Sequence, residues 1–232
     1  MTTLEMALNP LDRYKGTRKP DEVRQSDVVP DKTVEEMLEK YEEVHTFDNN
    51  HKYYIHPFDT MLSKIKDIAS ETILTPKQIN QTLQAIKPND NYGRLRFISW
   101  LIQSSYDAGH NDFFLDLRNI THFYGLCREV KGKTNNKVNL TLDGAAGNNC
   151  VWFSEHITLK AQKVGDSCAS GSNYCEIEIR ETGDFCGDGA RNSLFKTAFQ
   201  HTYRQLCKQI DFSKGNTVQL LDANGNILEK KP

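Results

Sequence analysis

The sequence lacks several features that would assign it to a common functional class. No apolar run approaches the roughly 20 residues that span a bilayer. Residues 1–12 have neither the basic start nor the apolar stretch of a secretory signal. Lys plus Arg (29) nearly balance Asp plus Glu (31), so the basic excess of a dedicated nucleic-acid binder is missing. These absences predict a cytoplasmic protein that contacts neither a membrane nor a nucleic acid.

The common catalytic and cofactor motifs are also missing. The chain contains no Cys-x-x-Cys, no His-x-x-x-His, no Walker loop and no Rossmann fingerprint. Metal sites, phosphate cradles and dinucleotide sites use these spacings. The six cysteines, in a chain without a secretory signal, are expected to be reduced thiols. We therefore predict no cofactor and assign no catalytic residue.

The first half of the chain predicts a mobile arm over residues 1–32 and a helical region over 33–110. The arm carries three prolines and a basic cluster, Arg13, Lys15, Arg18 and Lys19, which leaves nucleic-acid contact as a weak alternative. Amphipathic stripes predict four helices: from Thr33, whose spacing to Glu36 fits a capping box; after Pro57; from the Thr75 to Gln78 cap; and over Tyr92–Tyr106.

A repeat of 18 residues marks the second half. Gly147-Asn148-Asn149-Cys150 is followed by Gly165-Asp166-Ser167-Cys168 and by Gly183-Asp184-Phe185-Cys186. Alternating strands, such as 157–161 and 175–179, lie between these turns. Residues 138–143 indicate an earlier coil that an insertion sets out of phase. This period is too short for helical repeats and suits a β-solenoid, a coil of short strands and tight turns.

Stacked coils would place equivalent residues about 4.8 Å apart in ladders. Leu159, Ile177 and Phe195 would form an inward ladder, and the opposite face would carry Thr158, Glu176 and Leu194. Glycine at each turn would permit a positive φ. Over the whole chain we predict an α+β protein with the β-solenoid, a single-stranded β-helix, over residues 111–199. A capping helix and a β-hairpin with an Asn-Gly turn would follow over residues 200–232.

The stretches 164–171 and 183–190 resemble the GxGxG β-solenoid domains. These include the C-terminal domain of the glutamate synthase large subunit and a subunit of formylmethanofuran dehydrogenase. The lead-in 97–126 is similar to that of small, mostly archaeal proteins that place a helical segment before such coils. Trp152-Phe153-Ser154 departs from the pattern, because it replaces a glycine-bearing corner. In glutamate synthase the domain is structural, so the resemblance implies scaffolding and transfers no active site.

Three groups of residues are candidates for chemistry. Cys150, Cys168 and Cys186 would stack closely enough to share a soft metal, although buried cysteines also pack as small hydrophobes. Asp166 and Asp184 would stack, and a cation such as Ca²⁺ would relieve the repulsion between their carboxylates. Alternatively, their side chains would form the local hydrogen bonds of the turns. His110 with Asp112 could act as a base and its orienter, or form an ordinary turn.

These patterns favour a non-catalytic structural scaffold or protein-interaction module. Its partner would be another protein or a second copy of the chain. The alternative is an enzyme subunit or a metal or redox protein that uses the stacked cysteines. The other cysteines, Cys127, Cys175 and Cys207, are scattered in the sequence and are expected to pack in the core.

Overall fold

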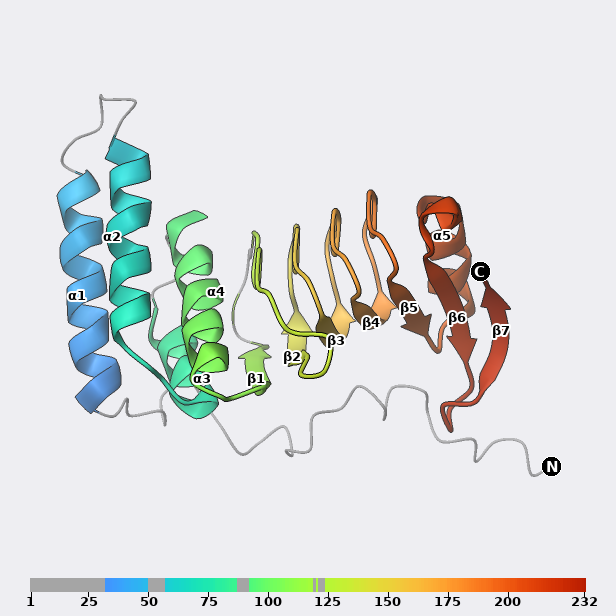
Figure 1. Cartoon of the computed structure of the whole chain (residues 1–232), viewed down its shortest axis with the longest axis horizontal. Coiled ribbons are helices and arrows are strands. Elements are labelled where there is room, and N and C mark those ends of the chain that lie inside the picture. Colours follow the sequence, from blue (N-terminus) through green and yellow to red (C-terminus); the bar gives the residue numbers. More distant parts are fainter. Residues whose placement is uncertain (1–31, 50–56, 87–91, 119, 121–123) are drawn as a thin grey trace.

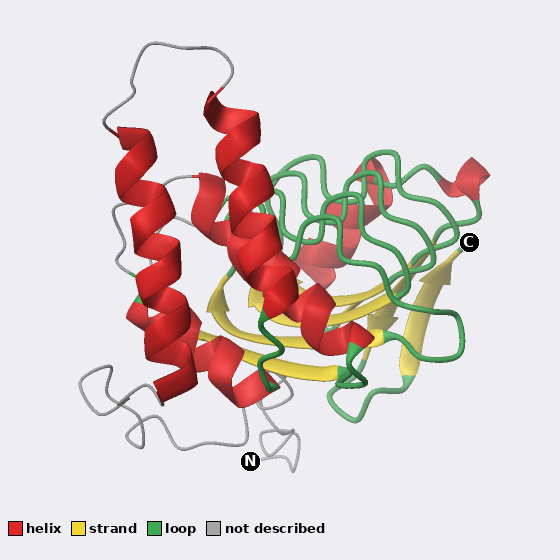
Figure 2. Cartoon of the chain, turned by 60° about the vertical axis from the view of Figure 1, so that its left-hand side comes forward, coloured by secondary structure: helices red, strands yellow, loops and turns green. Residues whose placement is uncertain are grey.

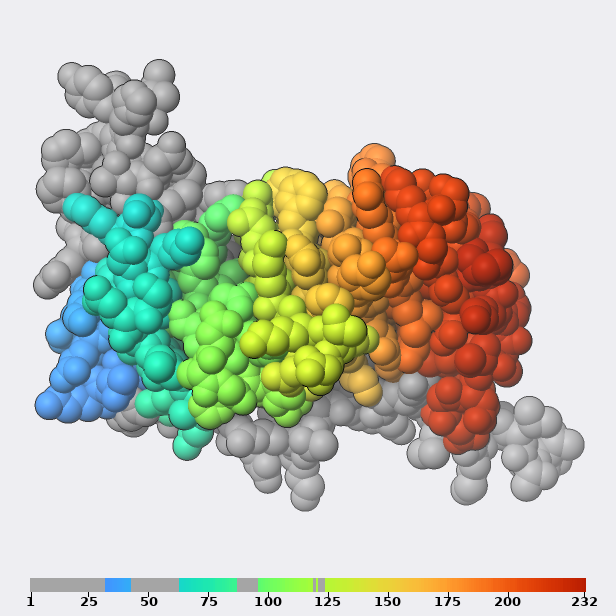
Figure 3. Space-filling model, in the orientation of Figure 1, coloured from blue at the N-terminus to red at the C-terminus, as the bar shows by residue number. Residues whose placement is uncertain are grey.

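The chain forms an elongated molecule whose elements follow one another along the long axis (Figure 1). The structure, a computed structural model, describes residues 32–49, 57–86, 92–118, 120 and 124–232, and their side chains except those of 43–49, 57–62 and 92–95. Helices lie at one end, a seven-stranded sheet follows, and a helix and a hairpin lie at the other end, so that the space-filling view runs through the sequence in order (Figure 3). The predicted α+β class agrees with this arrangement. The predicted arm, apart from Lys32, lies outside the described residues.

The N-terminal end holds four helices: α1 (Lys32–Asn49), α2 (Pro57–Glu71), α3 (Pro76–Ala85) and α4 (Tyr92–Asp107). Helix α3 begins as predicted, because the Thr75 side chain accepts the Gln78 N–H and the Gln78 side chain accepts the Thr75 N–H. The prediction of a Thr33 cap was wrong. Helix α1 begins at Lys32, which pairs with Glu36 at 3.5 Å, so Thr33 lies inside the first turn. No described helix is long and apolar enough to cross a membrane.

The sheet consists of β1 (Asp112–Leu117), β2 (Val138–Ala145), β3 (Ile157–Lys163), β4 (Glu176–Glu181), β5 (Leu194–Thr197), β6 (Thr217–Leu221) and β7 (Ile227–Lys231). The strands lie in sequence order, and β1 to β6 are all parallel. Strand β7 is antiparallel to β6, as the predicted hairpin requires. The sheet is open, with β1 and β7 at its edges.

The register follows the repeat. Leu159 is paired with Ile177, and Ile177 with Phe195; all three side chains are fully buried. The outward row of Thr158, Glu176 and Leu194 is paired in the same way. Both predicted ladders are therefore confirmed. The inward ladder continues at both ends, to Leu140 in β2 and Val218 in β6.

Each strand from β2 to β5 follows a segment of turns, and the turns stack as a separate layer beside the strands (Figure 2). We call a turn segment with its strand a rung, which gives four rungs over residues 124–145, 146–163, 164–181 and 182–197. Backbone hydrogen bonds join successive turn segments. Those from Val151 to Leu126, from Ala169 to Cys150 and from Gly187 to Cys168 measure 2.9, 2.8 and 2.7 Å.

The turn glycines act mainly through close approach. Gly147 has a φ of +34°, but Gly165 and Gly183 lie outside the left-handed region, so the prediction of a positive φ at each turn was wrong. A Cβ on Gly165 would collide with Asn148 Oδ1 and lie 2.7 Å from the carbonyl carbon of Gly147. A Cβ on Gly183 would likewise lie 2.7 Å from backbone atoms of the preceding turn. Glycine is required here because the backbone of the previous rung passes where a side chain would begin.

Side-chain amides complete the backbone pairing at the N-terminal end of the sheet. From α3, Asn80 Oδ1 accepts the Asp116 N–H at 2.9 Å, and Gln84 Nε2 donates to the Asp116 carbonyl at 2.5 Å. From α4, the Gln103 side chain accepts the Lys131 N–H at 2.8 Å and donates to the Lys131 carbonyl at 3.2 Å. The helical region therefore caps the first strand and the first turn segment.

Helix α5 (Gln200–Gln209) serves the same purpose at the other end, where the sequence predicts a capping helix. Thr202 donates to the Arg180 carbonyl at 2.5 Å and Gln205 to the Gly183 carbonyl at 3.1 Å. Ile210, directly after the helix, fills the space beside Gly187. A short 3-10 helix, Phe212–Lys214, then leads into β6.

Candidate functional site

The predicted cysteine column is present and fully buried. Cys150, Cys168 and Cys186 occupy equivalent positions in successive rungs, and the Cys168 thiol lies beside both of the others. The interactions with Cys150 and Cys186, together with burial, raise the pKa of Cys168 well above its ordinary value, so it is a protonated thiol at neutral pH. Cys127, which seemed isolated in the sequence, is buried beside Cys150. Within the described ranges, no three His, Cys, Asp or Glu side chains are grouped so that they could hold a metal ion.

The predicted acidic pair takes part in the turns. Asn148 Oδ1 accepts the N–H of Asp166 at 2.9 Å, and Asp166 Oδ1 accepts the N–H of Asp184 at 2.9 Å. Each Asn or Asp side chain thus bonds to the backbone of the next rung, which is the turn role that the sequence left open beside cation binding. This ladder of side chains helps to keep the turns at their close spacing.

The His110 and Asp112 candidate does not form a catalytic pair. His110 is exposed, and no hydrogen bond joins its ring to Asp112 or to another described residue. Asp112 Oδ1 instead accepts a hydrogen bond of 2.9 Å from Asn139 in the neighbouring strand. Residues 108–111 connect α4 to β1 as the turn that the alternative reading predicted.

The structure reveals a groove that was not among the predictions. It has a volume of about 760 Å³ and lies between the helical end and the sides of the rungs. Its lining residues come from α2, from α4 and from all four rungs: Lys66, Trp100, Gln103, Asp107, Glu129, Lys131, Phe153, Glu155, Gly171, Ser172, Asn173 and Arg191. Because successive rungs are about 4.8 Å apart, the part between Lys131 and Arg191 is about 14 Å long.

Aromatic side chains border this groove. Phe153 is 48% exposed, and its ring lies over Gly171 of the next rung, where a Cβ would collide with it. It stacks on Trp152 at 4.7 Å, and the Arg128 guanidinium lies 4.0 Å from the centre of the Trp152 ring. Glycine in the third rung thus makes room for the aromatic pair in the second. These are the residues at which the sequence departs from the glycine-bearing pattern.

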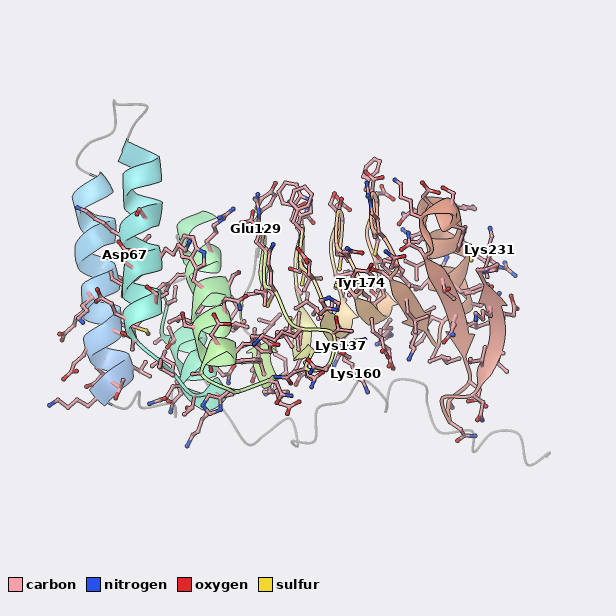
Figure 4. The ribbon with its side chains drawn as sticks, in the orientation of Figure 1. Asp67, Glu129, Lys137, Lys160, Tyr174 and Lys231 are labelled. Carbon is pink, nitrogen blue, oxygen red and sulfur yellow. The ribbon has the colours of Figure 1, made fainter. Side chains whose placement is uncertain are left out.

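Charges of both signs line the groove, and three of its six charged side chains, Glu129, Lys131 and Glu155, are in ion pairs. Glu129, on the side of the rungs that faces α4 (Figure 4), accepts from Arg96 at 2.8 Å and Arg128 at 2.9 Å. Lys131 pairs with Glu155 at 3.0 Å. Arg191, at the far end, is exposed and has no ion-pair partner within the described part of the chain. The groove therefore offers one accessible cation at the end away from the helices.

The comparisons with known proteins add no assignment. No protein-family model matches the chain, and no curated protein and no solved structure was found to match it.

Proposed function

We propose that the chain is a non-catalytic scaffold that binds another protein, and that residues 111–199 wind as a short β-solenoid that supplies the rigid part. The parallel order of β1 to β5, the 18-residue register of β3 to β5 and the stacked turn segments support the solenoid. The resemblance to GxGxG domains with a structural role agrees with this proposal. We place the protein in the cytoplasm, where its six thiols would stay reduced.

The groove is the observation that carries the proposal. An extended polypeptide advances about 3.3 Å per residue, so four or five residues would span the part between Lys131 and Arg191. The exposed Phe153 ring offers an apolar contact of the kind that anchors protein interfaces. The Arg191 guanidinium would pair with a carboxylate of the partner. Hydrogen bonds between rungs hold these groups in place before a partner binds.

A peptide selection tests this proposal. Random peptides displayed on phage would be selected against the wild-type protein and then measured against the double variant Phe153→Ala/Arg191→Glu. We expect the selected peptides to bind the wild type and to lose at least about tenfold in affinity on the variant. Lys208→Ala, an exposed change in α5, is the matched control and should leave affinity unchanged. Peptides that bind all three proteins equally would rule the groove out.

The alternative is an enzyme subunit or a metal or redox protein that uses the stacked thiols of Cys150, Cys168 and Cys186, which lie next to one another but, among the described residues, do not belong to a group of three ligands suited to a metal ion. Elemental analysis of the purified protein would decide between the two. A stoichiometric soft metal in the wild type that is absent from Cys168→Ser would favour the alternative over the scaffold. Metal-free protein whose thermal stability is the same with and without chelator would reject it.

A further inference from the structure

A second pocket, which shares no lining residue with the groove, lies where two irregular segments flank the repeat. The first is an insertion in the first rung. Six residues separate Lys131 from Val138 in the first rung, whereas only one separates Glu155 from Ile157 in the second. The additional residues form a small loop, closed by two backbone hydrogen bonds of 3.0 Å between Lys133 and Asn136. The C-terminal hairpin is the second irregular segment. The pocket, of about 380 Å³, lies between the loop and the hairpin.

The inserted loop supplies one wall of the pocket. Thr134 Oγ1 lies 3.5 Å from His156 Nε2 in the second rung. Lys137 reaches past β3 to Glu176 in β4, with 3.8 Å between Nζ and the carboxylate oxygen. The side chain of Thr134 thus extends from the first rung to the second, and that of Lys137 extends from the first rung to the third. Lys137 and Tyr174 lie near one another on the face of the rungs seen in Figure 4.

The hairpin supplies the opposite wall. Gln219 of β6 is paired with Lys230 of β7 on one side and with Lys196 of β5 on the other. Thr217 and Gly215, from the start of β6 and the turn before it, complete this wall. Two lysines and an amide therefore lie side by side on neighbouring strands.

Ring and amide groups form the floor. His156 stacks on Tyr174 with ring centres 5.0 Å apart and an angle of 4° between the planes. Tyr174 remains 48% exposed, and Asn192 follows it in the next rung, with its amide bonded to Asn173 at 3.2 Å. The floor thus presents polar groups that can hydrogen-bond to hydroxyl or phosphate oxygens of a ligand.

The charge of the pocket is positive. Its one carboxylate, Glu176, is already engaged by Lys196 at 2.5 Å and lies close to Lys137. Lys230 has no ion-pair partner among the described residues. Two lysines, Lys137 and Lys230, line the pocket, and Lys196 engages its one carboxylate from outside the lining. The pocket therefore favours an anion, and its volume is that of a small-molecule site.

We propose that this pocket binds a small organic phosphate of the size of a pentose phosphate. The phosphate would lie between Lys137 and Lys230, and the hydroxyl groups would bond to Asn192, Gln219 and Thr217. The pocket shares no lining residue with the groove, so this binding is separate from the proposed contact with a protein. Failure of either proposal leaves the other standing.

A titration by NMR tests the proposal on the full chain. Ribose 5-phosphate, added to isotope-labelled protein, should give saturable shifts at the amide signals of Tyr174, Asn192 and Gln219. Lys137→Gln and Lys230→Gln should each weaken binding at least about fivefold, because each removes one charge next to the phosphate. Lys163→Gln, an exposed lysine of β3 outside the pocket, is the control and should not change the affinity.

Comparison ligands make the test decisive. Inorganic phosphate should bind at least about fivefold more weakly than ribose 5-phosphate, because it lacks the hydroxyl groups. Ribose without phosphate should not bind. The proposal is overturned if no saturable shift occurs, if inorganic phosphate binds as tightly as the sugar phosphate, or if all three lysine variants behave like the wild type. Spectra of each variant without ligand establish that it is folded.

Discussion

Glycine at the rung-to-rung turn sets how closely two rungs approach. At Gly165 a Cβ would lie 2.7 Å from the carbonyl carbon of Gly147, and neither backbone can move without breaking bonds to its neighbours. We therefore expect Gly165→Ala to lower the free energy of unfolding by about 3 kcal/mol, as severe overpacking does. Denaturant unfolding followed by circular dichroism would measure this change.

Gly189→Ala is the matched control for this prediction. Gly189 has a φ of +69°, but the atom nearest to a Cβ there lies 3.7 Å away. Gly189→Ala should therefore lower the free energy of unfolding only by the cost of placing an alanine in the left-handed backbone conformation, about 1–2 kcal/mol. If Gly189→Ala destabilised the protein more than Gly165→Ala, close approach would not be the reason for glycine at the turn.

The ion pair of Glu176 and Lys196 gives a prediction about pH. Partial burial raises the pKa of Glu176, but the hydrogen bond and charge of Lys196, with Lys137 nearby, outweigh it and hold the pKa below its ordinary value. The stabilisation is therefore complete above the ordinary glutamate pKa of about 4.3 and is lost as pH falls through the lowered value. Lys196→Met should reduce the free energy of unfolding at pH 7, by at most about 1 kcal/mol for this partly exposed pair, and much less at pH 2. Urea unfolding at the two pH values measures it, and an equal loss at both would contradict it.

Residue spacing predicted part of this chemistry and missed part of it. The identical spacing of three Gly-(Asn/Asp)-x-Cys motifs was sufficient to predict the pairing of Leu159 with Ile177. The position of Cys127 beside Cys150 was not predicted, because the insertion in the first rung moves Cys127 out of the 18-residue phase. The steric reason for glycine at position 165 was not predicted either. A collision between rungs depends on distances in space, which no local sequence pattern contains.

At the scale of elements, the helices protect the open backbone of the sheet. Asn80 of α3 accepts the partly buried N–H of Asp116, which has no strand on that side. Asn80→Ala should lower the free energy of unfolding by about 1–3 kcal/mol, because the Asp116 N–H loses its hydrogen-bond partner. It should also speed hydrogen exchange at the Asp116 amide. Lys77→Ala, an exposed change on the same helix, should alter neither quantity. An unchanged exchange rate at Asp116 in Asn80→Ala would show that the amide cap contributes nothing.

Hydrophobic periodicity predicted the helices and strands β2, β3 and β4 close to their observed positions, and the Asn-Gly turn predicted the hairpin of β6 and β7. It could not predict the groove, because the groove depends on how α4 is placed against the rungs. A signal was nevertheless present. Trp152-Phe153 breaks the glycine pattern, and the structure places Phe153 at the border of the groove. A bulky residue at a repeat position that otherwise holds glycine therefore indicated where the surface is specialised.

The whole molecule is a linear array in which each strand contacts its neighbours in the sequence. The strands lie in sequence order from β1 to β7, and the inward ladder from Leu140 to Val218 passes through every strand from β2 to β6. In such an array, stability is approximately a sum over units and the interfaces between neighbours. A destabilising substitution in a central strand should therefore reduce the stability of the strands on both sides of it. A destabilising substitution in a strand near one end should affect only that end.

Two substitutions in the same ladder test this expectation. Ile177, in the central strand β4, and Val218, in β6, are both fully buried. Ile177→Ala should lower the free energy of unfolding by about 2–5 kcal/mol, because it creates a cavity. Hydrogen exchange measured by mass spectrometry should show reduced protection in β3, β4 and β5. Val218→Ala should raise exchange in β5, β6 and β7 and leave β1 and β2 protected. If both variants raised exchange equally in all seven strands, the sheet would unfold as one cooperative unit, and the array description would be wrong.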